Sequence, residues 1–281
     1  MKFTFNLFAK ELILFSATLA LGLATAYRYL TLVSGQPIIQ APTLSISDIL
    51  VLAVIITLFI IVLQFRRVAQ VVFWIFLTLV IFSGTVIVFD SFFNSNWDIL
   101  VGLAMLVLFF WRHSVLMHDI AIGVSLAGIG AAIGLGITPD LAIVFLLILS
   151  FYDIIAVYKT RHMVKMAESM VQSGAIFGFI IPTEFRLFLS HRKEARAQIG
   201  STSQRFMLLG SGDIGLPVVF MSSLVRQSVG EAAVVGLFAV GGLMLTHLLF
   251  VNQPHRKAMA ALPPIATMCL VGYVVALLIG L

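Results

Sequence analysis

The sequence predicts an all-α polytopic membrane protein with nine transmembrane helices, a cytoplasmic N-terminus and an outside C-terminus. Composition is the first observation behind this class: 61% of the 281 residues are hydrophobic and only 10% are charged, values that soluble globular domains do not reach. The second is that the chain divides into apolar runs of membrane-spanning length, since a hydrocarbon core of ~30 Å needs roughly 20 apolar residues per helix.

Nine apolar runs lie between polar breaks, and each predicts one helix. The first also imitates a signal peptide, because Lys10 and an apolar stretch precede the cleavage-site pattern Ala24-Thr25-Ala26. The apolar stretch continues to Val33, so we predict an uncleaved helix. In chain order the runs are Leu12–Val33, Ile46–Phe65, Ala69–Phe89, Trp97–Trp111, Asp119–Ile137, Leu141–Val157, Phe206–Leu224, Ala232–Val251 and Pro264–Leu281.

Basic residues predict the orientation of these helices. With the N-terminus inside, fifteen of the 17 Lys and Arg residues fall on the inner side, and only Arg28 and Arg226 fall outside. Cytoplasmic loops carry such an excess of positive charge. The pI of about 9.6 therefore reflects topology and lipid headgroups, and we predict no nucleic-acid partner. The single cysteine, Cys269, excludes an internal disulfide and a Cys-based zinc framework, and we predict no cofactor or metal.

One long polar segment divides the chain into three parts: a six-helix part at 1–158, a cytoplasmic loop at 159–205 and a three-helix part at 206–281. Within the loop, Arg161–Val171 has apolar residues at helical spacing and predicts an interfacial amphipathic helix. Ala175–Ile181 and Phe185–Leu189 are rich in β-branched and aromatic residues and predict two short strands around a turn at Pro182-Thr183-Glu184. A loosely ordered basic loop is the alternative.

Two aspartates lie inside apolar runs, Asp153 in the sixth and Asp213 in the seventh. A carboxyl at membrane depth costs roughly 3 kcal/mol or more and by default marks a functional site. At 1.5 Å per helical residue, Asp153 would lie ~9 Å above Lys159 in the membrane and Asp213 ~12 Å from Arg205. Helices adjacent in sequence pack together. Two facing carboxyls cannot both ionise, so they share a proton, as in enzymes that activate water between two aspartates.

The residues that flank the aspartates fit this hypothesis. Gly210 and Gly212 remove side chains around Asp213, which would let another backbone approach and the helix distort. Tyr152 places a phenol next to Asp153, although adjacent helical residues point about 100° apart, so packing is an equal alternative for it. We expect Thr246 and His247, in the eighth run, to make hydrogen bonds between helices and not to act as ligands.

Three motifs resemble those of the presenilin and signal peptide peptidase superfamily of GxGD intramembrane aspartyl proteases, most closely its short microbial (archaeal) presenilin homologues. Tyr152-Asp153 resembles the YD motif, Gly210-Ser211-Gly212-Asp213 the GxGD motif, and Ala261-Leu262-Pro263 the PALP motif, in the same order and spacing. The family's first proline is Ala260 here. The likeness covers nearly the whole chain, including the large loop between the sixth and seventh helices.

The resemblance implies a presenilin-like fold and an aspartic endopeptidase that cleaves within membranes, with Asp153 and Asp213 catalytic and Tyr152, Gly210 and Gly212 supporting them. It also implies that Ala261, Leu262 and Pro263 abut the active site and help to hold substrate. The two prolines Pro263 and Pro264 remove backbone donors and favour an extended approach to the last helix, and simple helix initiation is the competing interpretation.

The resemblance and the predicted orientation together indicate the substrates. An outside C-terminus favours the presenilin-like branch over the signal peptide peptidase branch, which implies single-span membrane-protein substrates with an outside N-terminus, cleaved in the cell membrane of a prokaryote. A helical peptide bond in lipid is shielded, so the substrate must unwind. The strand Ala175–Ile181, with Ile180 and Ile181 near its end, would offer an edge for the unwound chain.

Two other classes compete with proteolysis. A proton- or cation-coupled transporter would use the same two aspartates as an ion or proton site, and the lengths of the helices suit it equally well. It gives no reason for the Gly-x-Gly sequence before Asp213 or for the third motif. A purely structural role, with two aspartates that join helices, is disfavoured by the cost of burying both.

Overall fold

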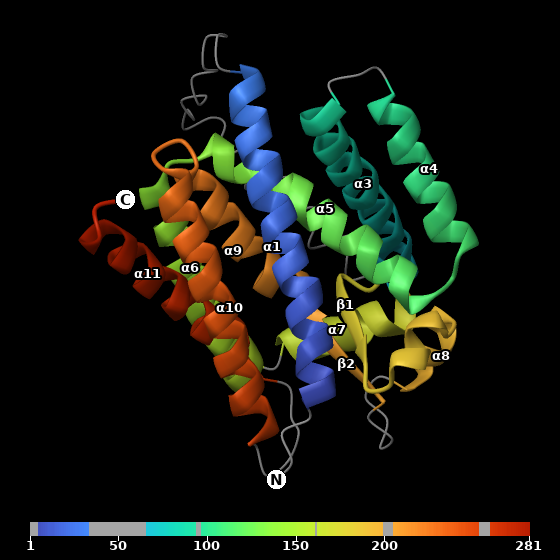
Figure 1. The fold of residues 1–281 in the computed structure, drawn as a ribbon. Helices are drawn as coiled ribbons and strands as arrows, with labels where there is room; N and C mark the ends of the chain where they lie inside the picture. Colours follow the sequence, from blue (N-terminus) through green and yellow to red (C-terminus); the bar gives the residue numbers. More distant parts are fainter. Residues whose placement is uncertain (1–4, 34–65, 94–96, 161, 199–204, 253–258) are drawn as a thin grey trace, which may run out of the picture.

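A computed structural model of the chain describes residues 5–33, 66–93, 97–160, 162–198, 205–252 and 259–281 (Figure 1). The elements in chain order are α1 Phe5–Val33, α3 Arg66–Phe93, α4 Asp98–Trp111, α5 Val115–Gly136, α6 Pro139–Ile154 with a π-helical continuation Ile155–Lys159, α7 His162–Ser173, β1 Gly178–Pro182, a 3-10 turn Phe185–Leu189, α8 Arg192–Gln198, β2 Phe206–Gly210, α9 Ser211–Leu224, α10 Val229–Val251 and α11 Leu262–Leu278.

Eight of the nine predicted runs contain an apolar helix. Within the described ranges, five helices are long and apolar enough to cross a membrane, and they match the first, third, fifth, sixth and eighth runs. Three shorter apolar helices, α4, α9 and α11, match the fourth, seventh and ninth. The second run, Ile46–Phe65, lies outside the described residues, so nine spans and the orientation of the termini stay predictions.

Helix α1 runs through the middle of the bundle (Figure 1) and packs against α3, α5, α9 and α10. Helix α5 crosses the molecule behind it and contacts both α3 and α9. Glycines on α5 allow these contacts, because a Cβ added at Gly128 would lie 2.1 Å from the carbonyl oxygen of Gly84 on α3. A Cβ at Gly134 would lie 2.4 Å from the carbonyl oxygen of Val219 on α9. At both points two helices touch backbone to backbone.

The hairpin β1–β2 and helices α7 and α8 gather at the end of the bundle where α1 begins (Figure 1). Helix α7 confirms the amphipathic helix predicted at Arg161–Val171, shifted by one or two residues. Strand β1 confirms a strand within the predicted region, although it begins at Gly178 and ends at Pro182.

The strand predicted at Phe185–Leu189 is wrong. These residues form a 3-10 turn whose Phe188 is buried, whereas Phe185 and Leu189 are exposed. The partner of β1 is β2, which is part of the run predicted as a continuous seventh helix. Short apolar runs do not distinguish a buried strand from a helix, and the hairpin partner lies beyond the loop, where a local turn pattern does not point.

The two strands pair in an antiparallel ladder that joins the loop to the start of α9. Gly178 and Gly210 face each other at the end of the ladder nearest α9. There is no room for a side chain at Gly178, because an added Cβ would lie 2.2 Å from the carbonyl oxygen of Leu209. Gly178 also has a φ of 154°, a conformation that other residues rarely adopt. The register pairs Gly178 with Gly210, Phe179 with Leu209, Ile180 with Leu208, Ile181 with Met207 and Pro182 with Phe206.

Candidate active site

Asp153 lies in the last turn of α6 and is buried, with 5% of its surface exposed. Tyr152 beside it is 52% exposed, as expected for adjacent residues that point about 100° apart on a helix. Directly after α6 the chain widens into the π-helical turn Ile155–Lys159. Such turns are rare, occur frequently at functional sites, and offset the side chains that follow.

Asp213 lies in the first turn of α9, three residues after the end of β2. The backbone N–H of Gly210 donates a hydrogen bond to its carboxylate. The change from strand to helix at Gly210–Ser211 therefore places Asp213 where a free N–H can hold it. The helical rise of 1.5 Å behind the predicted depth of Asp213 does not apply to Phe206–Gly210, because a strand rises ~3.3 Å per residue.

The two carboxyls nevertheless lie on neighbouring helices, within electrostatic range of each other. Helix α6 packs against α9, and the charge of Asp153 acts on the Asp213 carboxyl. The side chains come from neighbouring helices, as the sequence predicts. Asp153 lies in the last turn of α6, and Asp213 follows the hairpin strand β2 by three residues.

The third motif reaches Asp153 from α11. The backbone N–H of Leu262 donates to Asp153 Oδ2 at 3.4 Å, and Leu262 is buried with 4% exposed. Pro263 and Pro264 occupy the first turn of α11, where their missing N–H groups need no partner. The Leu262 N–H also lies in this first turn and has no partner within the helix, so it is available to bind Asp153. Ala260, which replaces the family's proline, is also buried.

The two glycines of the second motif have different surroundings. A Cβ added at Gly210 would lie 3.1 Å from Asp213 Oδ2, so the carboxylate would have to shift. A Cβ added at Gly212 meets no described atom within 4 Å, and Gly212 is exposed. The predicted close approach of another backbone is therefore wrong for Gly212 among the described residues, while Gly210 makes room for the aspartate itself.

Helix α5 and the start of α1 hold β1 in place. The Ile180 N–H donates to Asp119 Oδ1 at 2.8 Å, and His118 Nε2 lies 3.1 Å from the Gly178 carbonyl oxygen. Since a carbonyl only accepts, that nitrogen carries the proton. Lys10 Nζ donates to the carbonyls of Pro182 and Thr183 at 3.0 and 2.7 Å. All three side chains are buried, and none was recognised as a site residue from the sequence.

These bonds settle which edge of the hairpin is open. Ser211 N–H donates to the Phe177 carbonyl, and hydrogen-bonded pairs alternate with non-hydrogen-bonded pairs along an antiparallel ladder. The Ile180–Leu208 pair is consequently non-hydrogen-bonded, and its backbone groups point outward. On β1 that outer edge is taken by α5, and Ile180 and Ile181 are fully buried. The edge free of α5 is on β2, at Leu208.

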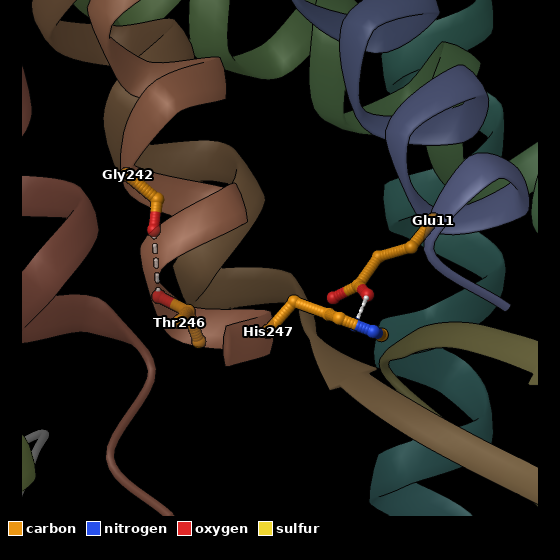
Figure 2. A network of polar contacts seen from close by, with 4 residues as sticks. All are labelled: Glu11, Gly242, Thr246 and His247. Atoms are coloured by element: carbon orange, nitrogen blue, oxygen red, sulfur yellow. Dashed lines mark hydrogen bonds and ion pairs between the residues drawn. The ribbon is translucent and has the colours of Figure 1, made fainter. Parts of the chain in front are cut away.

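A second buried polar contact joins α1 to α10 (Figure 2). His247 Nδ1 on α10 lies 2.8 Å from Glu11 Oε2 on α1, and both side chains have no exposed surface. Thr246 donates to the Gly242 carbonyl of its own helix at 2.9 Å and approaches the Ala261 carbonyl at 3.4 Å. The hydrogen bond between helices predicted for His247 is confirmed, whereas Thr246 bonds its own helix and the residue directly before α11. Glu11 was missed, because it precedes the first apolar run.

The family of the chain follows from comparison with known proteins. The family model described as signal-peptide peptidase, presenilin aspartyl protease matches residues 10–280. The chain belongs to this family. It is an intramembrane aspartic protease, and the family predicted from the three motifs is confirmed. Among the residues that the structure describes, no group of three His, Cys, Asp or Glu side chains could hold a metal ion.

Two solved structures share the fold of this presenilin-family chain. Both are described as a presenilin family intramembrane aspartate protease, one in space group C222 and one in P2. The first is 18% identical, covers 92% of this chain and 94% of its own, and has a TM-score of 0.55. The second is 18% identical, covers 95% and 97%, and has a TM-score of 0.59. A search among curated proteins found no match.

Proposed function

We propose that this protease hydrolyses peptide bonds within or near transmembrane segments of single-span membrane proteins, using a water held between Asp153 and Asp213. The observation that carries the proposal is that α6 and α9 bring these carboxyls together. One ionised and one protonated carboxyl suffice for the chemistry. The ionised one removes a proton from water as the oxygen attacks the peptide carbon, and the protonated one donates to the carbonyl oxygen.

The second half of the reaction returns the site to its starting state. The resulting gem-diol loses a proton to the carboxylate formed in the first half, the C–N bond breaks, and the leaving nitrogen takes a proton from the other carboxyl. One water is consumed, and one proton remains on the pair. The Leu262 N–H at Asp153 and the Gly210 N–H at Asp213 hold the carboxylates during these transfers.

Substrate would be held in an extended form by the outer edge of β2. An unwound segment that pairs with Leu208 adds a third strand to the hairpin. That strand would run past Gly210 toward Asp213, because β2 leads directly into α9. Ile180 and Ile181 would serve this site through the strand pair, since their own edge faces α5. The third motif would border the substrate at Asp153 through Ala261, Leu262 and Pro263, while Tyr152, largely exposed, would contact lipid or substrate.

The test uses the full chain purified into liposomes with a single-span reporter whose N-terminus lies outside. We expect cleavage, inhibition by a transition-state analogue of aspartic proteases, and no cleavage by Asp153→Asn or Asp213→Asn in folded protein. Asp140→Asn is the matched control, because Asp140 is exposed at the opposite end of α6. Turnover by either purified single variant would reject the two-aspartate mechanism. Absence of cleavage by the wild-type protein, with ion flux that depends on both aspartates, would favour the transporter.

A further inference from the structure

The contact between Glu11 and His247 is a fully buried acid–base pair between two helices that are far apart in sequence (Figure 2). The second carboxyl oxygen, Glu11 Oε1, is buried without a hydrogen-bond partner among the described residues. A buried pair of this kind loses much of its attraction to desolvation, and a well-packed apolar pair of the same volume is often as stable. Stability alone therefore gives little reason for a glutamate and a histidine here.

The position of the pair relative to the two aspartates gives a better reason. Helix α1 packs against α9, the helix of Asp213, and the charge of Glu11 acts on the Asp213 carboxyl. On α10, His247 follows Thr246, which approaches the Ala261 carbonyl directly before the Leu262 N–H that binds Asp153. Successive residues of α10 therefore contact Ala261, next to the Leu262 N–H that binds Asp153, and Glu11 on α1, the helix that packs against α9.

The neighbouring residue on α1 adds a third connection. Lys10 Nζ holds the end of β1 through the carbonyls of Pro182 and Thr183. Lys10 and Glu11 thus join the first turns of α1 to the hairpin and to α10.

We propose that Glu11 and His247 are positioning residues for the proteolysis inferred above. Their hydrogen bond fixes α1 against α10 next to α9, the helix of Asp213, and Glu11 contributes to the pH range over which the two aspartates keep their shared proton. This inference rests on the proposed function. In this proposal Glu11 and His247 touch neither the substrate nor the reacting water and act through the aspartates.

Other charged groups face this region among the described residues, including Glu184, which interacts with Lys10, and Asp153, which interacts with Asp213. From α10 and α9, the elements packed against this part of α1 contribute His247 and Asp213, and α1 itself contributes Lys10, which is held by β1. Helix α5 contributes His118 and Asp119, both bonded to β1. On α3, Asp90 meets Tyr29, near the opposite end of α1. Among the described residues, Glu11 is therefore the carboxylate outside the aspartate pair that lies within electrostatic range of Asp213.

The experiment measures cleavage of the liposome reporter against pH, with kcat and KM at each point. Glu11→Gln removes the charge and keeps a hydrogen-bonding side chain. Because a negative neighbour holds a shared proton in place, we expect the alkaline limb of the rate profile to move toward acid by about one pH unit. We also expect kcat at the optimum to fall on the order of tenfold with little change in KM. Glu231→Gln is the matched control, a buried glutamate at the opposite end of α10, and should leave the profile unchanged.

A purely structural role would give a different pattern. Glu11→Gln would then lower the melting temperature and the rate at every pH but leave the limbs in place, which would overturn the proposal. If Glu11→Gln does not fold, the exchanged variant Glu11→His with His247→Glu restores the pair and moves the charge to α10. A wild-type profile in that variant, or failure of both variants to fold, would also overturn it. A wild-type protein that does not cleave at all rejects the proposed function instead.

Discussion

Asp153 and Asp213 obtain their backbone donors in two different ways, although they form one pair. The Gly210 N–H that bonds Asp213 comes from the strand just before its own helix, while the Leu262 N–H that bonds Asp153 comes from a distant helix start. In both cases the donor is free because it lies where a helix begins. Mutations at the first residues of α9 and α11 should therefore disturb the two aspartates more than they reduce the stability of the helix bundle.

Gly210→Ala and Gly212→Ala form a matched pair that tests this. The new methyl group at 210 would press on Asp213 Oδ2 at 3.1 Å, whereas at 212 it meets open space among the described atoms. Because a small displacement of a catalytic group is costly, we expect kcat to fall on the order of tenfold for Gly210→Ala and to stay near wild type for Gly212→Ala. Reporter cleavage with melting temperatures for both variants is the measurement. Equal losses would mean that Gly210 makes no special room for the carboxylate.

The dependence of cleavage on pH tests the shared proton. Activity requires one proton on the pair, so the rate should fall at both ends of a bell-shaped profile whose limbs belong to the pair and to neither residue alone. A rate that is flat from acid to strongly alkaline pH in folded protein would contradict the mechanism.

Unfolding of the extramembrane region should not distort that profile. Burial lowers the pKa of Arg192 on α8 to about 10. The pKa of Arg192 is lower in the folded protein than in the unfolded chain. The free-energy cost of burying its charge is therefore fully present below pH 10, and the stability of the fold rises only as pH increases above about 10. Between about pH 4 and 9 this titration leaves the fold unchanged. Circular dichroism over the same range is the control.

At the level of elements, the sequence predicts the helices well and the hairpin poorly. Apolar length predicts α1, α5 and α10, since a segment of roughly 20 apolar residues matches a spanning helix and a spanning strand is about half as long. Strand β2 was predicted as part of the seventh helix, because Phe206–Gly210 is as apolar as the helix that follows it. Its strand state comes from pairing with β1 across the intervening loop, a tertiary contact that local periodicity does not contain.

The same limit explains the residues that were missed. Asp153 and Asp213 were found because a carboxyl inside an apolar run is conspicuous. Glu11 stands one residue before such a run and Asp119 at the start of another, where a charged residue is ordinary. Only the packing of α1 against α10, and of α5 against β1, makes them buried partners.

A proline scan of β2 tests the open edge. At Leu208 the N–H points away from β1, so Leu208→Pro removes a donor to substrate and no bond of the hairpin. Met207 pairs with Ile181 in the hydrogen-bonded register, so Met207→Pro removes a hairpin bond instead. We expect Leu208→Pro to lower cleavage of a helical reporter several-fold at near wild-type stability, and Met207→Pro to lower both. Unchanged turnover of the reporter by folded Leu208→Pro would argue against strand addition.

At the scale of the whole molecule, the hairpin and the start of α1 lie at one end of the bundle (Figure 1), and α9, which carries Asp213 in its first turn, follows directly from β2. Water and an unwound substrate would reach the site from this end. The predicted orientation makes it the cytoplasmic end, because most basic residues of the sequence fall on that side.

Cysteine labelling in intact cells tests this orientation. The only native cysteine, Cys269, is fully buried, so a cysteine introduced elsewhere supplies the signal. With Cys269→Ser as background, we expect Leu281→Cys to react with a membrane-impermeant maleimide, since nine crossings place the C-terminus outside. Lys193→Cys, on the exposed side of α8, should react only after the membrane is permeabilised. The reverse pattern would place the active-site end outside, and the substrates would then present the opposite terminus to the protease.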